Sequence, residues 1–177
     1  MSFQRTTLAV ALALLAGSSQ AAIVSLSGDT TGGPSFNRLL EDVSGLSSEG
    51  TSVRYAAYQF TVDAAGLYTF LTTANFDNMA FLYAGSFDAT LPLAGALKGN
   101  DDLVSATTAG FSHALQAGGT YVYLTTGFAN GDAGVFSTTI GGPGLIAAVP
   151  EPSTYALLAL GLAAVGAVAR RQGQRGR

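Results

Sequence analysis

The chain has 177 residues, of which 48% are apolar and 11% charged, and it contains no cysteine. This length leaves room for one domain of ordinary size together with targeting segments. The lack of cysteine excludes disulfides, a thiolate nucleophile and a zinc-thiolate site.

Charge is distributed unevenly along the sequence. Residues 23–149 hold three basic and ten acidic residues, a net charge of −7, while four of the other basic residues follow residue 169. An acidic segment disfavours nucleic acid and anionic lipid as partners, because phosphate binding depends on Lys and Arg. Neutral glycans, cations and other proteins remain as partners for this part of the chain.

The N-terminus has the layout of a secretory signal peptide. Arg5 precedes an apolar run over residues 8–16, and Ser19-Gln20-Ala21 forms a small-x-small cleavage site. The apolar run is too short for a comfortable transmembrane helix. We therefore predict a signal peptide over residues 1–22, cleaved after Ala21 or Ala22, with an uncleaved N-terminal anchor as the alternative.

Short runs of strand-like sequence follow, separated by turn-forming residues. Apolar and polar residues alternate cleanly over residues 54–62, a period typical of a half-buried strand. Further strands are predicted at residues 23–27, 67–73, 79–84, 111–115, 120–128 and 134–140. Residues 54–62 and 67–73 are predicted to form an antiparallel hairpin, and residues 85–108 a loop that connects two sheets.

This spacing of strands, without a convincing helix between them, predicts an all-β body over residues 23–142. The architecture that fits best is an antiparallel β-sandwich or barrel. The segment Gly141-Gly142-Pro143-Gly144 is expected to end the last strand and to begin a linker over residues 143–153.

Several short motifs of the body resemble the pre-peptidase C-terminal type of bacterial β-sandwich. They are spread over residues 36–140 and comprise Phe36-Asn37-Arg38, the strand at 58–62, the segment 66–70, Phe76-Asp77, Leu82-Tyr83, Asn100-Asp101-Asp102, the segment 115–121 and the strand at 134–140. The resemblance implies a non-catalytic, jelly-roll-like module.

Acidic residues supply the main candidate for chemistry in the body. Asp77, Asp88, Asp101 and Asp102 fall in the two loops that flank the predicted strand at 79–84. Carboxylate and carbonyl oxygens are the ligands that calcium prefers, so these four residues are candidate calcium ligands. The alternative is that they are solvated turn residues, because Asp favours turn conformations.

Catalytic readings have less support. His113 is the only histidine, and the sequence lacks the Gly-x-Ser-x-Gly element of many serine hydrolases, so a strand histidine that faces solvent or a partner residue is expected. Paired carboxylates suit a glycosidase, but no cleft-forming helices or long loops accompany them. We predict no catalytic residues and no cofactor other than calcium.

Aromatic residues at alternate positions are a second binding candidate. Tyr55, Tyr121, Tyr123 and Phe128 are candidates for a carbohydrate-stacking strip. Aromatic residues at period two pack across strands more often than they bind ligands, so core packing is the competing interpretation.

The C-terminal segment combines three parts that each suit a different layer of a membrane. Val149-Pro150-Glu151-Pro152-Ser153 is a short Pro-rich box, residues 154–169 form an apolar segment, and Arg170, Arg171, Arg175 and Arg177 form a basic end. At about 1.5 Å per residue, the apolar segment is slightly short of a bilayer core of about 30 Å. The Arg cluster is predicted to hold the C-terminus in the cytoplasm.

This order of parts resembles the PEP-CTERM sorting signal of Gram-negative bacteria. The resemblance implies recognition by an exosortase, a membrane protease-transpeptidase, in bacteria that often make exopolysaccharide. Exopolysaccharide or other surface proteins are then the expected partners of the body. We accordingly predict a non-enzymatic protein that passes through the inner membrane to the cell surface or extracellular matrix. A permanently anchored binding protein and an envelope hydrolase are the alternatives.

Overall fold

The structure is a computed structural model that describes residues 21–150, 160 and 162. Residues 21–150 form ten β-strands without a helix, and every strand pairing is antiparallel. The prediction of an all-β, antiparallel body is thus confirmed. The strands are β1 (Ala22–Asp29), β2 (Ser35–Phe36), β3 (Val53–Val62), β4 (Gly66–Ala74), β5 (Asn78–Ala84), β6 (Ala96–Asn100), β7 (Thr108–Leu115), β8 (Thr120–Gly127), β9 (Val135–Gly142) and β10 (Ile146–Ala148).

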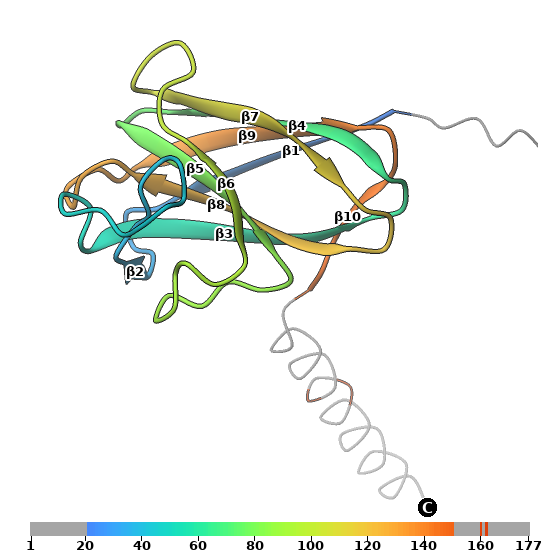
Figure 1. The fold of residues 1–177 in the computed structure, drawn as a ribbon, viewed down its shortest axis with the longest axis horizontal. Coiled ribbons are helices and arrows are strands. Elements are labelled where there is room, and N and C mark those ends of the chain that lie inside the picture. The colour runs from blue at the N-terminus through green and yellow to red at the C-terminus, as the bar shows by residue number, and fades with distance from the viewer. Residues whose placement is uncertain (1–20, 151–159, 161, 163–177) are drawn as a thin grey trace, which may run out of the picture.

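These strands form two sheets that lie face to face as two layers (Figure 1). The first sheet has four strands in the order β1-β9-β4-β7. The second sheet has six strands. Five of them follow the order β10-β3-β8-β5-β6, and the sixth, β2, also pairs with β3. The main hydrophobic core takes side chains from both sheets, as a β-sandwich requires.

Alternation along each strand decides which side chains enter the core. In β3, Phe60 and Val62 are buried between the sheets with the half-buried Tyr58, whereas Val53 and Tyr55 belong to a second cluster on the other face. In β4, Tyr68 and Phe70 are buried, while Leu67 and Leu71 are exposed. The alternation over residues 54–62 therefore separated the two faces of β3 correctly, whereas no faces were predicted for residues 67–73.

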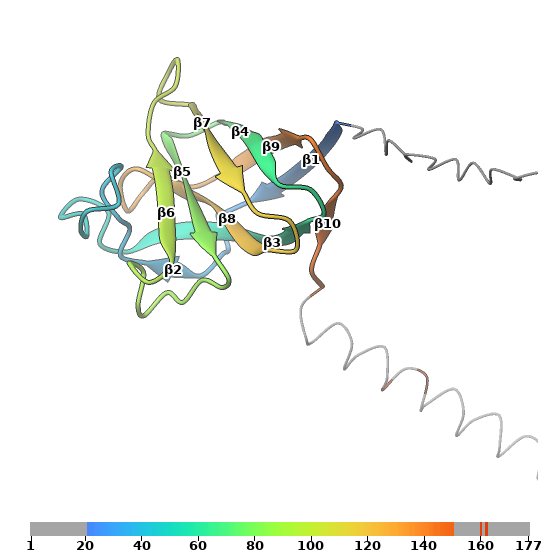
Figure 2. The same ribbon diagram turned by 45° about the vertical axis from the view of Figure 1, so that its right-hand side comes forward.

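The two strands in the middle of the second sheet, β5 and β8, are buried on both of their faces. In β5 every residue from Asn78 to Tyr83 is buried, and β8 is buried over seven of its eight residues. The outer cover consists of the chain between β2 and β3 and the loop after β5, which supply residues such as Leu39, Val43 and Phe87 to the second cluster. In Figure 2 the loops between β2 and β3 gather at one end of the sandwich, and β10 lies at the other.

The predicted hairpin of residues 54–62 and 67–73 is wrong. The corresponding strands β3 and β4 lie in different sheets, where β3 pairs with β8 and β10 and β4 pairs with β7 and β9. Phe60 and Phe70 then face the same core from opposite sides, with ring centroids 6.1 Å apart. Alternation indicates that a strand has a buried face, but it does not name the neighbouring strand.

Two short strands also fall where connections were predicted. The edge strand β6 lies within the predicted loop of residues 85–108, and its sequence Ala-Leu-Lys-Gly-Asn lacks the β-branched and aromatic residues that signal a strand. β10 lies within the predicted linker of residues 143–153 and pairs with the end of β3. The sheet therefore extends to Ala148, next to the Pro-rich box.

The signal peptide falls almost wholly outside the described residues, which begin at Ala21, so cleavage after Ala21 or Ala22 stays a prediction. The topology of a jelly roll likewise stays a prediction, since the structure establishes the antiparallel sandwich and not that finer class.

The core assignment leads to a matched pair of substitutions in one strand. Phe70→Ala should lower the free energy of unfolding by about 3 to 5 kcal/mol, because it removes a buried ring that stacks on Tyr123 at 5.2 Å. Leu67→Ala, three residues away and 64% exposed, should change it by less than about 0.5 kcal/mol. Urea unfolding followed by circular dichroism measures both values. Equal effects of the two substitutions would contradict the assignment of faces.

Candidate functional site

Three of the four candidate calcium ligands lie together at one end of the sandwich. Asp77 lies directly before β5, and Asp101 and Asp102 directly follow β6. Because β5 and β6 pair antiparallel with Ala80 opposite Asn100, the start of one strand lies beside the end of the other. One carboxylate oxygen from each of Asp77, Asp101 and Asp102 lies within 4.8 Å of the other two.

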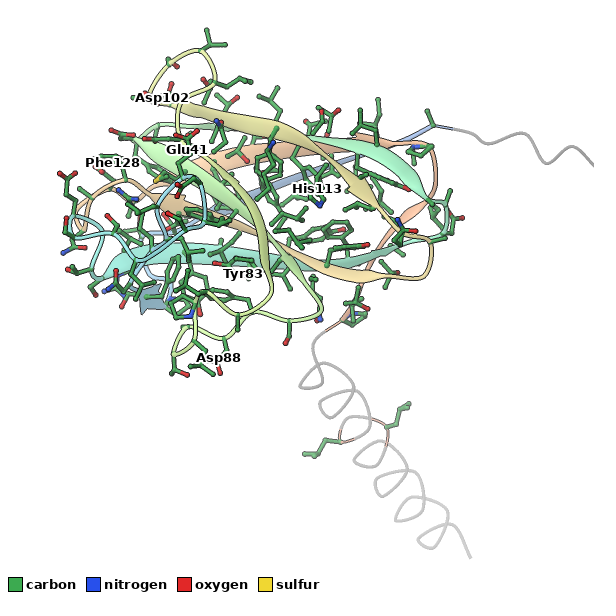
Figure 3. The ribbon with its side chains drawn as sticks, viewed as in Figure 1. Glu41, Tyr83, Asp88, Asp102, His113 and Phe128 are labelled. Atoms are coloured by element: carbon green, nitrogen blue, oxygen red, sulfur yellow. The ribbon has the colours of Figure 1, made fainter. Side chains whose placement is uncertain are left out.

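Asp88 does not join this acidic cluster. It lies in the loop after the opposite end of β5, and Figure 3 shows it well apart from Asp102. Its Oδ1 accepts hydrogen bonds from the backbone N–H of Thr90 at 2.8 Å and from the Thr90 hydroxyl at 2.7 Å. Asp88 therefore stabilises a turn, which was the alternative role considered for the acidic residues.

Charge repulsion is concentrated at Asp101. Burial, together with the carboxylates of Asp102 and Asp77, raises the pKa of Asp101 to about 6. Burial also raises the pKa of Asp77, and the nearby Asp132 and Asp102 act in the same direction. Among the described residues, the buried Oδ1 of Asp101 has no hydrogen-bond partner. A cation held by these carboxylates would relieve both the repulsion and the missing contact.

Arg38 compensates part of this negative charge, a role that the sequence did not reveal. It is only 3% exposed, its Nε donates to the carbonyl of Phe128 at 2.6 Å, and its Nη1 donates to the carbonyl of Leu39 at 2.9 Å. The guanidinium also lies 4.6 Å from the centre of the Phe128 ring. Its charge opposes the rise in the pKa values of Asp101 and Asp77.

The path of the Arg38 side chain explains one glycine. A Cβ at Gly50 would lie 2.4 Å from Cγ of Arg38, so any larger residue would displace the arginine. An arginine placed among the apolar residues Phe36, Leu39 and Leu40 was the one sequence signal of a buried cation here.

His113 has no catalytic arrangement around it. It lies in β7 opposite Tyr68 and alternates with the core residues Phe111 and Leu115, so it is half-buried on the inward side rather than facing solvent. Burial, and secondly the nearby Lys98, lower the pKa of His113, which favours the neutral imidazole. No hydrogen bond joins it to a Ser or Asp among the described residues, so this part of the chain holds no Ser-His-Asp triad.

The candidate aromatic strip is a set of packing residues. Tyr121 and Tyr123 belong to the core between the sheets, and the Tyr123 hydroxyl shares a hydrogen bond of 2.7 Å with the hydroxyl of Thr72. Tyr55 packs edge-on against Phe36 and Phe87 on the other face of the second sheet. The ring of Phe128 packs against the guanidinium of Arg38. The packing interpretation of these aromatic residues is confirmed.

The Pro-rich box begins on the surface of the folded body. The backbone N–H of Val149 donates to the carbonyl of Gln59 at 3.0 Å, which continues the pairing of β10 with β3 by one residue. Val149 and Ala148 line a hollow of about 320 Å³ together with Tyr55, Tyr58 and Phe87. Pro150 is exposed. Val149 lies midway along β3, toward the β10 edge of the second sheet, whereas Asp101 and Asp102 follow β6 at the opposite edge.

Fold and geometry thus define an antiparallel β-sandwich that ends directly in a Pro-rich C-terminal box. Residues 148–172 match the PEP-CTERM protein-sorting motif, which confirms the resemblance seen in the sequence for this segment. The match begins at Ala148, so the motif overlaps the last residue of β10. No curated protein matches the chain. The likeness of the body to pre-peptidase C-terminal domains stays a prediction.

Solved structures provide only distant similarities. The periplasmic g-type lysozyme inhibitor PliG from Aeromonas hydrophila has a TM-score of 0.39 and 14% identity, covering 69% of this chain and 85% of its own. A family 35 carbohydrate-binding module of Abf62 from Cellvibrio japonicus has a TM-score of 0.38 and 13% identity, covering 72% and 99%. A family 35 module from an environmental isolate has a TM-score of 0.39 and 16% identity, with the same coverage. With TM-scores below 0.5, these similarities carry no argument about this chain.

Most of the sorting segment lies outside the described residues. This holds for Glu151, Pro152, Ser153 and the arginines Arg170, Arg171, Arg175 and Arg177, whereas Leu160 and Leu162 are described as helical and exposed. Within the described residues, no helix has both the length and the hydropathy needed to span a membrane. The membrane helix at 154–169 therefore stays a prediction.

The raised pKa of Asp101 predicts a pH-dependent stability difference. The pKa of about 6 in the folded protein lies above the ordinary aspartate value of 3.8, so protonation of Asp101 stabilises the folded protein, and this stabilisation is lost as the pH rises from below 4 to above 6. At pH 7.5 without metal, Asp101→Asn should raise the free energy of unfolding by about 1 kcal/mol, a figure reduced for solvent screening. At pH 3.5 the two proteins should be nearly equal.

Thermal unfolding of both proteins across this pH range checks the prediction. Asp88→Asn is the matched control, because Asp88 has a lowered pKa caused by its hydrogen bonds to Thr90, and its substitution should lower stability at pH 7.5. A loss of stability in Asp101→Asn at pH 7.5 would show that the cluster is not repulsive.

Proposed function

We propose that this protein is an exosortase substrate that is exported by its signal peptide and delivered to the cell surface or extracellular matrix. Its body is a binding or structural module and not an enzyme. The observation that carries the proposal is the sorting motif at residues 148–172. Export is supported by residues 1–22, which have the layout of a signal peptide. A signal peptide would bring the chain to the membrane, where an exosortase recognises its motif.

The position of the motif also fits processing near a membrane. The hydrogen bond of Val149 to Gln59 ties the chain to the body, and only four residues, Pro150 to Ser153, lie between Val149 and the predicted membrane segment. Proline on both sides of Glu151 disfavours helix, so this short stretch is expected to stay extended and accessible to an enzyme. A body held this close to the bilayer would have β10 near the membrane surface.

A binding or structural role is supported by what the body offers chemically. The described residues contain neither a hydrogen-bonded catalytic triad nor a cysteine, and the charge of the buried Arg38 partly offsets the repulsion in their one carboxylate cluster. Exopolysaccharide and other surface proteins are the proposed partners. The competing function is a permanently anchored binding protein, in which the same segment serves only as a membrane span.

Processing can be tested in a host that has an exosortase. Mass spectrometry of the mature protein should find a C-terminus that lacks the apolar segment and the Arg cluster. Replacing Pro150-Glu151-Pro152 with Ala should leave the protein in the inner membrane with Arg177 attached. As a control, Ala replacement of Ser86 and Ser48 on the body should leave processing unchanged. Mature wild-type protein that retains Arg177 would favour the permanent anchor.

We also propose calcium as a ligand of the acidic cluster. The supporting observation is that Asp77, Asp101 and Asp102 converge within 4.8 Å while Oδ1 of Asp101 is buried without a partner. Calcium takes six to eight oxygen ligands, so carboxylates that bind through both oxygens, with backbone carbonyls and water, suit it. Asp88 is not part of this proposal.

Calcium should raise the melting temperature of the wild type, because a ligand that binds only the folded state stabilises it. At about 100 times the dissociation constant the gain is about 2.7 kcal/mol. Asp101→Asn with Asp102→Asn should abolish the shift, whereas Asp88→Asn should keep it. No shift of the wild type at millimolar calcium, with magnesium as the comparison ion, would show that the cluster holds no calcium.

A further inference from the structure

The outward face of the four-stranded sheet carries an unusual set of side chains. The strand register arranges three complete rows of four residues across β1, β9, β4 and β7. The middle row consists of Ser25, Thr139, Leu71 and Gly110, and the two flanking rows contain six Ser or Thr residues, one glycine and Ile23. We call these twelve positions the bare face. None of them is charged.

This lack of charge is notable in an acidic body. Eight of the twelve positions are exposed, three are half-buried, and Gly110 is buried beside the side chains of Leu71 and Leu103. Soluble surfaces are about 25 to 35% Asp, Glu, Lys and Arg, so eight exposed positions would ordinarily include about two or three charges. Residues 23–149 carry ten acidic side chains, and the nearest on this sheet is Asp29 at the end of β1. The outer face of the other sheet, by contrast, is covered over β5 and β8 by the protein's own loops.

The chemistry of the bare face restricts what can cover it. It has no outward aromatic side chain on which a sugar ring would stack, and no Lys or Arg for an anionic polymer. Its hydroxyls both donate and accept hydrogen bonds, as the contact of 3.0 Å between Thr69 and Ser112 illustrates. Two such faces can therefore satisfy each other, with the 41% exposed Leu71 and the 75% exposed Ile23 supplying apolar contact.

Charge favours a second copy as the occupant, and the area sets the strength of the contact. Four strands about 4.8 Å apart, each with five residues between the outer rows, present roughly 330 Å² per copy, or about 650 Å² for a pair, which is the size of a weak and transient contact. Two acidic bodies repel least when they meet through their uncharged surface.

We propose that the bare face binds the bare face of a second copy of this chain, in a two-fold symmetric, sheet-to-sheet dimer. In such a pair the symmetry axis lies between the two faces and runs through their centre. Residues at the centre then meet their own counterparts, whichever direction the axis takes. Leu71 and Thr139, which pair directly across β4 and β9, occupy this centre. The modest area makes the dimer weak in dilute solution and well populated where copies are concentrated.

Because the chain has no cysteine, single cysteines report the contact cleanly. The full chain in detergent, bearing Thr139→Cys, should form a covalent dimer with a short bis-maleimide reagent. Ser48→Cys is the matched control, since it is exposed in the chain that covers the opposite side of the molecule, and it should stay monomeric. Sedimentation of the unmodified protein should show a dimer that dissociates on dilution. None of these measurements depends on export or processing.

A charge-pair experiment tests the geometry of the interface. Adding Leu71→Asp to Thr139→Cys should weaken association at least about tenfold and remove the cross-link, because two like charges would meet at the centre. Leu71→Lys should do the same alone, and a mixture of the Asp and Lys proteins should recover the cross-link. Circular dichroism confirms that each variant is folded. Equal cross-linking of Thr139→Cys and Ser48→Cys, no cross-linking of Thr139→Cys, or no recovery in the mixture would overturn the proposal.

Discussion

Burial of β5 and β8 on both of their faces is the constraint on which the rest of the body depends. The other sheet covers one face of β5 and β8. Their second face also carries apolar side chains, such as Met79 and Phe81 of β5, which need a cover of their own. Burying a large apolar side chain contributes about 1.5 to 3 kcal/mol, so leaving this face in water would remove a large share of the stability. The chain between β2 and β3 therefore has to fold back over the sheet.

That covering segment determines the electrostatics at its end of the molecule. Because it contains little regular structure, its path is held by specific contacts, among them the hydrogen bonds of Arg38 to the carbonyls of Phe128 and Leu39. Closing the core in this way buries a cation whose charge acts on two carboxylates of the acidic cluster, those of Asp101 and Asp77. The acidic cluster is thus coupled to packing, since the residue that partly balances its charge also fixes the cover of the sheet.

The sequence predicted the faces of the strands better than their partners. Alternation in β3 reports burial directly, because inward residues such as Phe60 must be apolar, and the convergence of Asp77 with Asp101 followed from two loops that flank one strand. The placement of β3 and β4 in different sheets depends on long-range pairing, which local pattern does not encode. The short edge strand β6 and the buried Arg38 were missed for a related reason. Their environments come from segments distant in sequence.

The pairing of β1 with β9 has a consequence for how the body is made. Ala22 lies opposite Gly142, so the first strand of the body pairs with its last long one. During synthesis β1 emerges early and stays without its partner until nearly the whole body has followed. Such non-local pairing slows folding, because the entropy cost of closing a long loop must be met before the contacts between the strands can stabilise the pair. The body therefore cannot complete its first sheet until synthesis has passed Gly142, and β1 stays unpaired for most of the time that the body is being made.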